Sequence, residues 1–124
     1  MNWITQVKRL SIYLRDGLAC AYCGHSVENG AQLTLDHLKP HSNGGTNHET
    51  NLVTGCQKCN SSRGNRPLAT FVKAVAVYRN HGVKADDILR HVRNASARVL
   101  KPFKADAAAM IERRGSVAKA LAKF

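Results

Sequence analysis

The sequence contains no long hydrophobic run and no recognisable targeting segment. Its longest uncharged apolar runs, such as 74–78 and 107–111, are far too short to span a bilayer. The first residues mix polar and apolar side chains, without an apolar core followed by a small-residue cleavage site. We therefore expect neither a membrane protein nor a secreted one, and the expected location is the cytoplasm.

Acidic residues are also scarce. Asp and Glu total 8 against 19 Lys and Arg, which gives a formal net charge of +11. Residues 1–59 carry a net charge of only +1, whereas residues 60–124 carry +10. Such an asymmetry indicates a polyanionic partner, with nucleic acid as the first candidate and an acidic membrane surface as the second. The alternative is that the charge only keeps a small protein in solution.

Large apolar side chains are few between residues 20 and 66, and the chain has neither internal repeats nor a low-complexity linker. A segment of about 47 residues with so little apolar surface cannot build much of a core of its own. We therefore expect this segment to be held together by a structural metal ion.

The four cysteines supply the ligands for such an ion. They form two Cys-x-x-Cys pairs, Cys20 with Cys23 and Cys56 with Cys59, separated by 32 residues. A disulfide framework would suit a secreted protein, and a redox role is typical of a single pair. Two pairs are the usual arrangement of a tetrahedral zinc site whose four thiolates leave no open position for chemistry.

The first half of the chain is predicted to contain one helix and two short strands. Apolar spacing predicts an amphipathic helix over 3–15, with Asn2 as its N-cap and Arg15 off its apolar face. The strands are expected at 32–37 and 51–53, with a turn between them.

The second half is predicted to be helical. Four helices are expected there, over 68–82, 86–99, 105–114 and 117–124. Asp86 is the expected N-cap of the second of these helices, and Pro102 is expected to interrupt the helical pattern before the third. Basic residues along this half favour a phosphate-contacting surface over a merely solvated helical face.

The segment between the two cysteine pairs holds the residues that suggest chemistry. Asp36 and His37 end the first predicted strand, Asn51 opens the second, and Asn60 directly follows the last cysteine. Carboxylate and amide oxygens suit Mg²⁺, and a neutral histidine beside such an ion can accept a proton from water. An Asp-His pair alone is common by chance, so the interpretation depends on all of these residues together.

These residues resemble those of the HNH endonuclease family, in its zinc-stapled form. The resemblance rests on five segments in the family's order and spacing, at 15–24, 35–40, 44–45, 51–53 and 56–60. It covers about residues 13–66 and implies an α+β fold, a ββα-metal (His-Me finger) core. A four-cysteine zinc site would staple this core, and an N-terminal helix and C-terminal helices would flank it.

The resemblance also implies roles for individual residues. His37 would be the general base that activates water, and Asp36 and Asn60 would hold one divalent ion, Mg²⁺ or Mn²⁺. Asn51 would support the site by fixing the loop and orienting His37. The family often has histidine where Asp36 and Asn60 stand, and their oxygen atoms favour an oxygen-preferring ion.

Three further residues are candidate phosphate contacts. Arg63 and Arg66 follow Asn60, and a guanidinium can clamp a phosphate with two hydrogen bonds. The alternative is that both are ordinary solvated arginines. His41, four residues after His37, either adds to the site or is an ordinary loop histidine.

The sequence therefore predicts a metal-dependent DNA endonuclease that hydrolyses phosphodiester bonds and nicks one strand per active site. Two alternatives stay open: a zinc-stapled nucleic-acid-binding module without cleavage, and a nuclease active only with a partner protein. Residues 1–66 would form the nuclease core with its N-terminal helix, and residues 67–124 a basic helical extension packed on or next to it. The extension is the expected surface for a homodimer or a protein partner. A phage, a mobile element or a bacterial defence system is the expected source, with the host cytoplasm as the location in the phage case.

Overall fold

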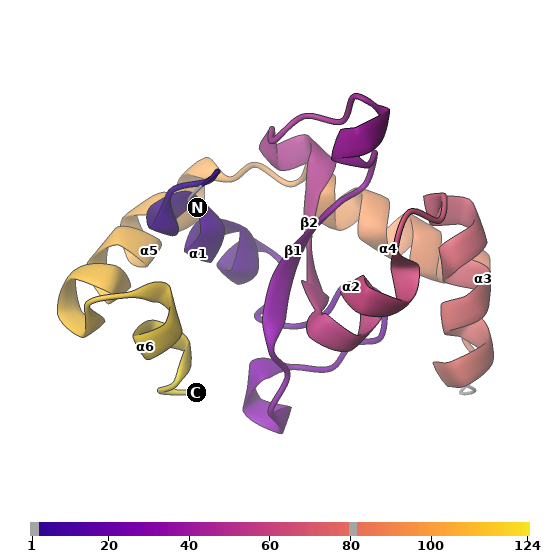
Figure 1. Ribbon diagram of the computed structural model, residues 1–124. Helices are drawn as coiled ribbons and strands as arrows, with labels where there is room; N and C mark the ends of the chain where they lie inside the picture. Colours follow the sequence, from indigo (N-terminus) through magenta and orange to yellow (C-terminus); the bar gives the residue numbers. More distant parts are fainter. Residues whose placement is uncertain (1–2, 80–81) are drawn as a thin grey trace.

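The structure is a computed structural model that describes residues 3–79 and 82–124 (Figure 1). Two antiparallel strands lie between two groups of helices. The α-helices are α1 (Gln6–Arg15), α2 (Gln57–Arg63), α3 (Leu68–Arg79), α4 (Ala85–Ala97), α5 (Lys101–Arg114) and α6 (Val117–Leu121). Short 3₁₀ turns occur at Val27–Asn29, His41–Asn43 and Glu49–Asn51.

The sheet consists of β1 (Leu33–His37) and β2 (Leu52–Cys56), paired so that Leu33 faces Cys56 and His37 faces Leu52. The chain passes from β2 directly into α2, because Cys56 caps the helix by accepting a hydrogen bond from the Cys59 N–H. Two strands followed at once by a helix form the expected ββα unit. The predicted α+β fold class is confirmed.

Apolar side chains form a separate core on each side of the sheet. On one side, Phe71 and Val75 of α3 and Val92 of α4 pack with the cysteine-bearing segments and with Val53. On the other side, a second core joins residues of α1, both strands, α5 and α6: Leu10, Ile12, Leu35, Leu52, Leu100, Ala107, Val117 and Ala120. Figure 1 shows this division, with α1, α5 and α6 left of the strands and α2, α3 and α4 right of them. The helices after residue 67 thus pack against the first half of the chain on both sides of the sheet.

Three helix starts differ from the predictions. The first helix begins at Gln6 with Thr5 as its cap, whereas the predicted cap, Asn2, lies outside the described residues. The helix predicted from Asp86 begins at Ala85, so that Asp86 lies within its first turn. Pro102 does not interrupt a helix: it occupies the first turn of α5, where its missing N–H would have had no partner in any case.

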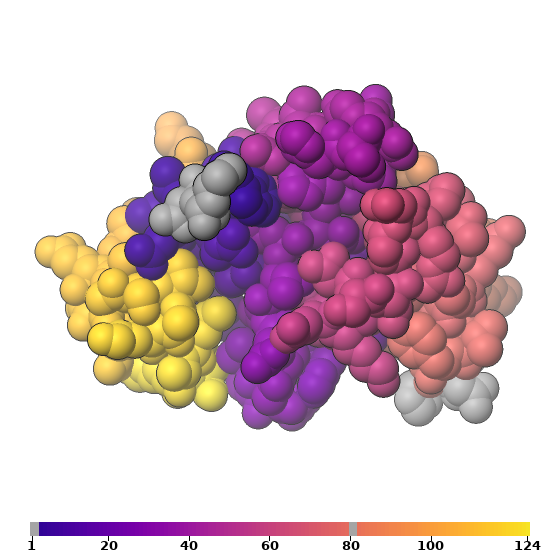
Figure 2. Space-filling model, viewed as in Figure 1, coloured from indigo at the N-terminus to yellow at the C-terminus, as the bar shows by residue number. Residues whose placement is uncertain are grey.

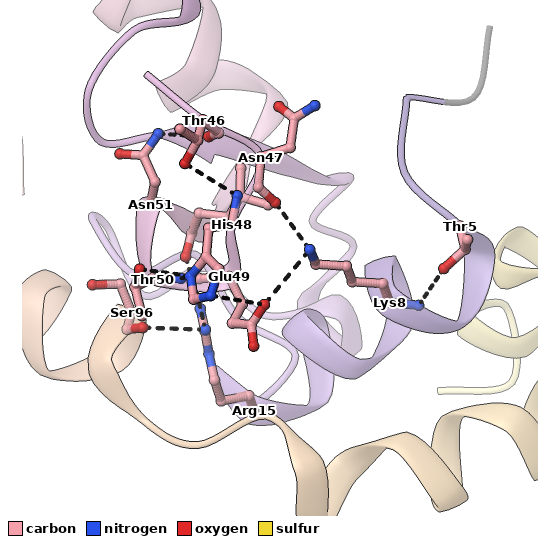
Figure 3. Close-up of polar contacts among 11 residues, drawn as sticks. Thr5, Lys8, Arg15, Thr46, Asn47, His48, Glu49, Thr50, Asn51 and Ser96 are labelled. Carbon is pink, nitrogen blue, oxygen red and sulfur yellow. Dashed lines mark hydrogen bonds and ion pairs between the residues drawn. The ribbon is translucent and has the colours of Figure 1, made fainter. Parts of the chain in front are cut away.

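Arg15 was expected on the polar side of its helix, and this prediction is wrong. The residue is only 2% exposed, and its side chain pairs with Asp16, with 2.8 Å between Nε and Oδ1. The same guanidinium donates hydrogen bonds to the carbonyls of Leu52 (2.8 Å), Glu49 (3.0 Å) and Ser96 (3.4 Å). Arg15 therefore joins α1 to β2, to the loop before it and to α4 (Figure 3).

Within the two described ranges, no helix combines the length and the apolar character needed to cross a membrane.

Candidate functional site

The four cysteines lie together, with their Sγ atoms all within 4.8 Å of one another. The Sγ atoms of Cys23 and Cys56 are 3.7 Å apart. A tetrahedral zinc ion with bonds of about 2.3 Å would place its thiolates about 3.8 Å apart. The four cysteines can therefore hold one metal ion, and zinc fits the donor set.

The surroundings of the cysteines support a closed site. Backbone N–H groups of Cys23 and Cys59 approach the Sγ atoms of Cys20 (3.5 Å) and Cys56 (3.4 Å), so each pair forms a tight knuckle. Tyr78 of α3 lies with its hydroxyl 3.2 Å from Cys59 Sγ. Burial and this contact raise the pKa of Tyr78 well above its usual range, so the hydroxyl stays protonated and can donate to a thiolate. Helix α3 thus covers the cysteine cluster.

A second group of predicted residues meets at a different place. Asp36 and His37 at the end of β1 and Asn60 on α2 line one pocket of about 310 Å³, together with Trp3 and His41. In Figure 2, the purple surface of β1 and of the loop after it lies between the indigo surface of α1 and the pink surface of α2. The structure therefore brings together the three side chains expected to carry the chemistry, and His41 with them.

Asp36 is 8% exposed and is held through one of its two oxygens. Its Oδ2 accepts hydrogen bonds from the Tyr22 hydroxyl and from Arg63 Nη1. Burial, and next the negative charge of Asp36, raise the pKa of Tyr22 far above its usual range, so Tyr22 remains a donor. Because both donors converge on Oδ2, neither of them occupies Oδ1, which suits a hard divalent ion.

Arg63 does not fit the expectation of a phosphate contact. Its side chain is 1% exposed, so it has almost no surface to offer a ligand. Besides Asp36, its guanidinium donates to the carbonyls of Arg66 (3.1 Å), His37 (2.9 Å) and Leu38 (2.7 Å). Arg63 holds the end of β1 in place. Arg66, by contrast, is exposed, and its role as a phosphate contact stays a prediction.

His37 lies between aromatic neighbours and a polar loop. Its ring centroid is 5.0 Å from that of Trp3 and 6.2 Å from that of His41. Its Nε2 lies 2.8 Å from Oδ1 of Asn47, a residue that the sequence analysis did not single out. Asn47 precedes β2 by several residues, and only the folding of the loop brings it to His37.

Asn51 closes this loop. Its side chain accepts a hydrogen bond from the Lys39 N–H (2.9 Å) and donates to the carbonyls of Lys39 (3.1 Å) and Thr46 (2.8 Å), the last of which is drawn in Figure 3. The loop is so tight at Gly45 that a Cβ there would lie 1.8 Å from the Lys39 carbonyl oxygen. This geometry is compatible with the supporting role predicted for Asn51.

Helix α1 braces the same loop from outside. Lys8 Nζ donates to the Asn47 carbonyl (3.0 Å) and lies 3.6 Å from the Glu49 carboxylate, as Figure 3 shows. The pKa of Glu49 is lowered by a hydrogen bond from its own backbone N–H, and next by the nearby positive charges of His48 and Lys8. Glu49 therefore keeps the negative charge that attracts Lys8 at pH values below the usual pKa range of a glutamate.

Comparison with known proteins finds similarity to endonucleases. Residues 20–75 match the family described as HNH endonuclease. The chain is 33% identical over 81 residues to the CRISPR-associated endonuclease Cas9 of Corynebacterium diphtheriae, covering 64% of this chain and 7% of that protein. It is 33% identical over 72 residues to the Cas9 of Actinomyces naeslundii, covering 57% of this chain and 6% of that protein.

A solved structure is also similar. The crystal structure of the Type II-C Cas9 enzyme from Actinomyces naeslundii aligns with a TM-score of 0.49 at 27% identity, covering 79% of this chain and 12% of that chain. In the two sequence alignments, the chain spans 7% and 6% of the Cas9 proteins, less than a tenth of the length of either one. Both are bacterial proteins and do not support the expected phage or mobile-element source.

Proposed function

We propose that this chain is a metal-dependent endonuclease that hydrolyses phosphodiester bonds of DNA, because residues 20–75 match the HNH endonuclease family. The observation that carries the proposal is the shared pocket of Asp36, His37 and Asn60. These side chains come from the end of a strand and from the helix behind it, and together they supply a base and two oxygen ligands.

In this proposal His37 acts as the general base. A water molecule in the pocket gives a proton to the imidazole while its oxygen forms a bond to the phosphorus atom. The bond between phosphorus and the 3′ oxygen then breaks, and its electron pair leaves with that oxygen, which takes a proton from solvent. The products are a 3′ hydroxyl and a 5′ phosphate.

Asp36 and Asn60 are the residues that would hold the divalent ion, Mg²⁺ or Mn²⁺. When bound, such an ion supplies positive charge that stabilises the phosphate and the leaving oxygen in the transition state. The contribution of the chain is to hold the Asp36 side chain in place, since Arg63 pairs with its carboxylate and Tyr22 donates a hydrogen bond to it.

Zinc is proposed as a structural ion at the other site, bound by Cys20, Cys23, Cys56 and Cys59. Four thiolates fill the coordination shell, so this ion takes no part in hydrolysis. Because Cys56 caps α2 and Cys59 lies in its first turn, one ion bound to both would fix the start of the helix that carries Asn60.

DNA is the proposed substrate because the net charge of +11 favours a polyanion. One pocket contains one set of reactive groups, so each encounter would cut a single strand. Exposed Arg66 and pocket-lining His41 are the proposed contacts to phosphates near the scissile bond.

Cleavage of supercoiled plasmid by the zinc-loaded protein tests the proposal. With Mg²⁺ or Mn²⁺ we expect relaxed circles to form before linear DNA. With EDTA we expect no cleavage product. His37→Ala should abolish nicking, whereas His91→Ala, at an exposed position on α4, should leave it unchanged. A folded protein that binds DNA in a gel shift without cutting it under any of these ions would contradict the proposal and favour a binding module.

A further inference from the structure

The hydrogen bond between His37 and Asn47 specifies which nitrogen of His37 can act as the base. The 2.8 Å contact joins His37 Nε2 to the side-chain oxygen of Asn47. An amide oxygen only accepts hydrogen bonds, so Nε2 must carry the proton. A neutral imidazole has a single N–H, which leaves Nδ1 with a free lone pair.

Asn47 is itself held in place by its surroundings. Its backbone carbonyl accepts a hydrogen bond from Lys8 Nζ at 3.0 Å, and Lys8 is drawn to the same loop by Glu49 (Figure 3). The ties of Asn51 to Lys39 and Thr46 close the loop immediately before Asn47. The side-chain oxygen of Asn47 therefore meets His37 from a braced position and not from a free loop.

We propose that Asn47 is a positioning residue, which fixes His37 in the Nε2–H tautomer and makes Nδ1 the atom that accepts the proton from water. Once that proton is on Nδ1, the ring is a cation and its Nε2–H bond to Asn47 becomes charge-assisted and stronger. Asn47 thus orients the ring before the step and stabilises its charged form during the step. The second part of this inference rests on the proposed function, whereas the tautomer does not.

The tautomer can be measured without any substrate. Long-range proton–nitrogen NMR spectra of zinc-loaded protein labelled at histidine separate protonated from unprotonated ring nitrogens, and comparison with His37→Ala assigns the signal. In a buffer alkaline enough to keep imidazoles neutral, we expect wild-type His37 to show Nε2–H with Nδ1 unprotonated. Asn47→Ala should give a mixture of tautomers, and Asn47→Asp should keep Nε2–H because a carboxylate also accepts.

Kinetics supply the second readout. We expect Asn47→Ala to lower kcat by about 10–100-fold with KM nearly unchanged, a loss of the size seen when hydrogen-bond partners of metal-ligating histidines are removed. Asn47→Asp should restore most of the loss. Asn43→Ala, which removes an exposed amide from the same loop, should alter neither the tautomer nor kcat.

Two results would overturn the proposal: wild-type His37 protonated on Nδ1, or an Asn47→Ala protein that retains the pure Nε2–H tautomer. Retention of wild-type kcat in Asn47→Ala would refute the catalytic part. If wild-type protein cuts no DNA, the proposed function fails, but the NMR result still decides whether Asn47 sets the tautomer.

Discussion

At the scale of single residues, Arg63 and Asp36 form a buried ion pair that shapes the candidate active site. Arg63 contacts the carboxylate of Asp36 and the carbonyls of His37 and Leu38, three consecutive residues at the end of β1. A buried charge is tolerated only when it is paired and hydrogen-bonded, and here both partners are. One side chain from the end of α2 therefore fixes the strand end that carries the proposed base and a proposed metal ligand.

Arg63→Met tests this reading, because it keeps much of the side-chain volume but leaves the Asp36 carboxylate without a counter-charge. We expect the free energy of unfolding to fall by about 3–5 kcal/mol, the usual cost of breaking one side of a buried pair. Chemical denaturation followed by circular dichroism measures the change. Arg90→Met is the matched control, since its 3.5 Å contact with Asp87 is exposed and should be worth less than about 1 kcal/mol. Equal stability of the two variants would contradict the structural role of Arg63.

At the scale of elements, the loop between β1 and β2 contributes to the candidate site through its fixed conformation. It is closed by Asn51, compressed at Gly45 and braced by Lys8 of α1. Its function would be to hold Asn47 against His37, so small displacements of the loop should affect chemistry more than stability.

Gly45→Ala displaces the loop directly. The added Cβ would lie 1.8 Å from the Lys39 carbonyl oxygen, a backbone atom that cannot move away alone. We expect the single-turnover cleavage rate to fall by about 100-fold, since misplacement of reacting groups by about 1 Å can cost that much. Gly55→Ala is the control, because its Cβ would meet Tyr22 at 3.7 Å, an ordinary contact. Equal rates for the two variants would show that the loop geometry does not matter.

The elements also show which features could be predicted from the sequence. The cysteine spacing and the Asp36-His37, Asn51 and Asn60 motifs have fixed local patterns, so the sheet, the cysteine cluster and the pocket were predictable. Pro102 was misread because a proline at the start of a helix and one that ends a helix look alike in sequence.

Contacts between residues distant in the chain were not predictable. Helical spacing predicts Arg15 off the apolar face, and Arg63 is predicted to contact phosphate or solvent. Only the tertiary fold supplies the carbonyls that bury both side chains. Asn47 was missed because nothing in its local sequence indicates that His37 is its partner.

At the scale of the whole molecule, two small cores lie on opposite sides of a two-stranded sheet. The core beside the cysteines includes Cys20, Cys56 and Cys59, so its stability should depend on the zinc ion that they are proposed to bind.

Zinc binding should therefore depend on pH. The pKa of the Cys20 thiol is raised to about 12, and the hydrogen bond with Cys23 is the largest cause. The metal-free protein therefore keeps the Cys20 thiol protonated at neutral pH. Since zinc binds thiolates, uptake must release the proton, and affinity should rise as pH rises. Titration with zinc against a competing chelator at pH about 6.5 and about 8 measures the effect. Identical affinities, with no proton release in a weakly buffered indicator solution, would contradict it.

The net charge makes a separate prediction for DNA binding. Each phosphate neutralised by Lys or Arg releases condensed counterions, so affinity should fall by at least about tenfold between about 50 and 200 mM salt. Fluorescence anisotropy of a labelled duplex, without divalent ions, measures this dependence. An affinity that stays constant over this range would rule out the basic second half of the chain as the DNA surface.

The most direct test of the central claim, that water activated at His37 hydrolyses the phosphodiester bond, is the chemistry of the new DNA ends. A duplex of known sequence is cut in a single turnover in water enriched in oxygen-18, and the products are analysed by mass spectrometry. The account predicts a 3′ hydroxyl and a 5′ phosphate that carries the heavy oxygen, with no product from His37→Ala. A 3′ phosphate, or a 5′ phosphate without heavy oxygen, would contradict it.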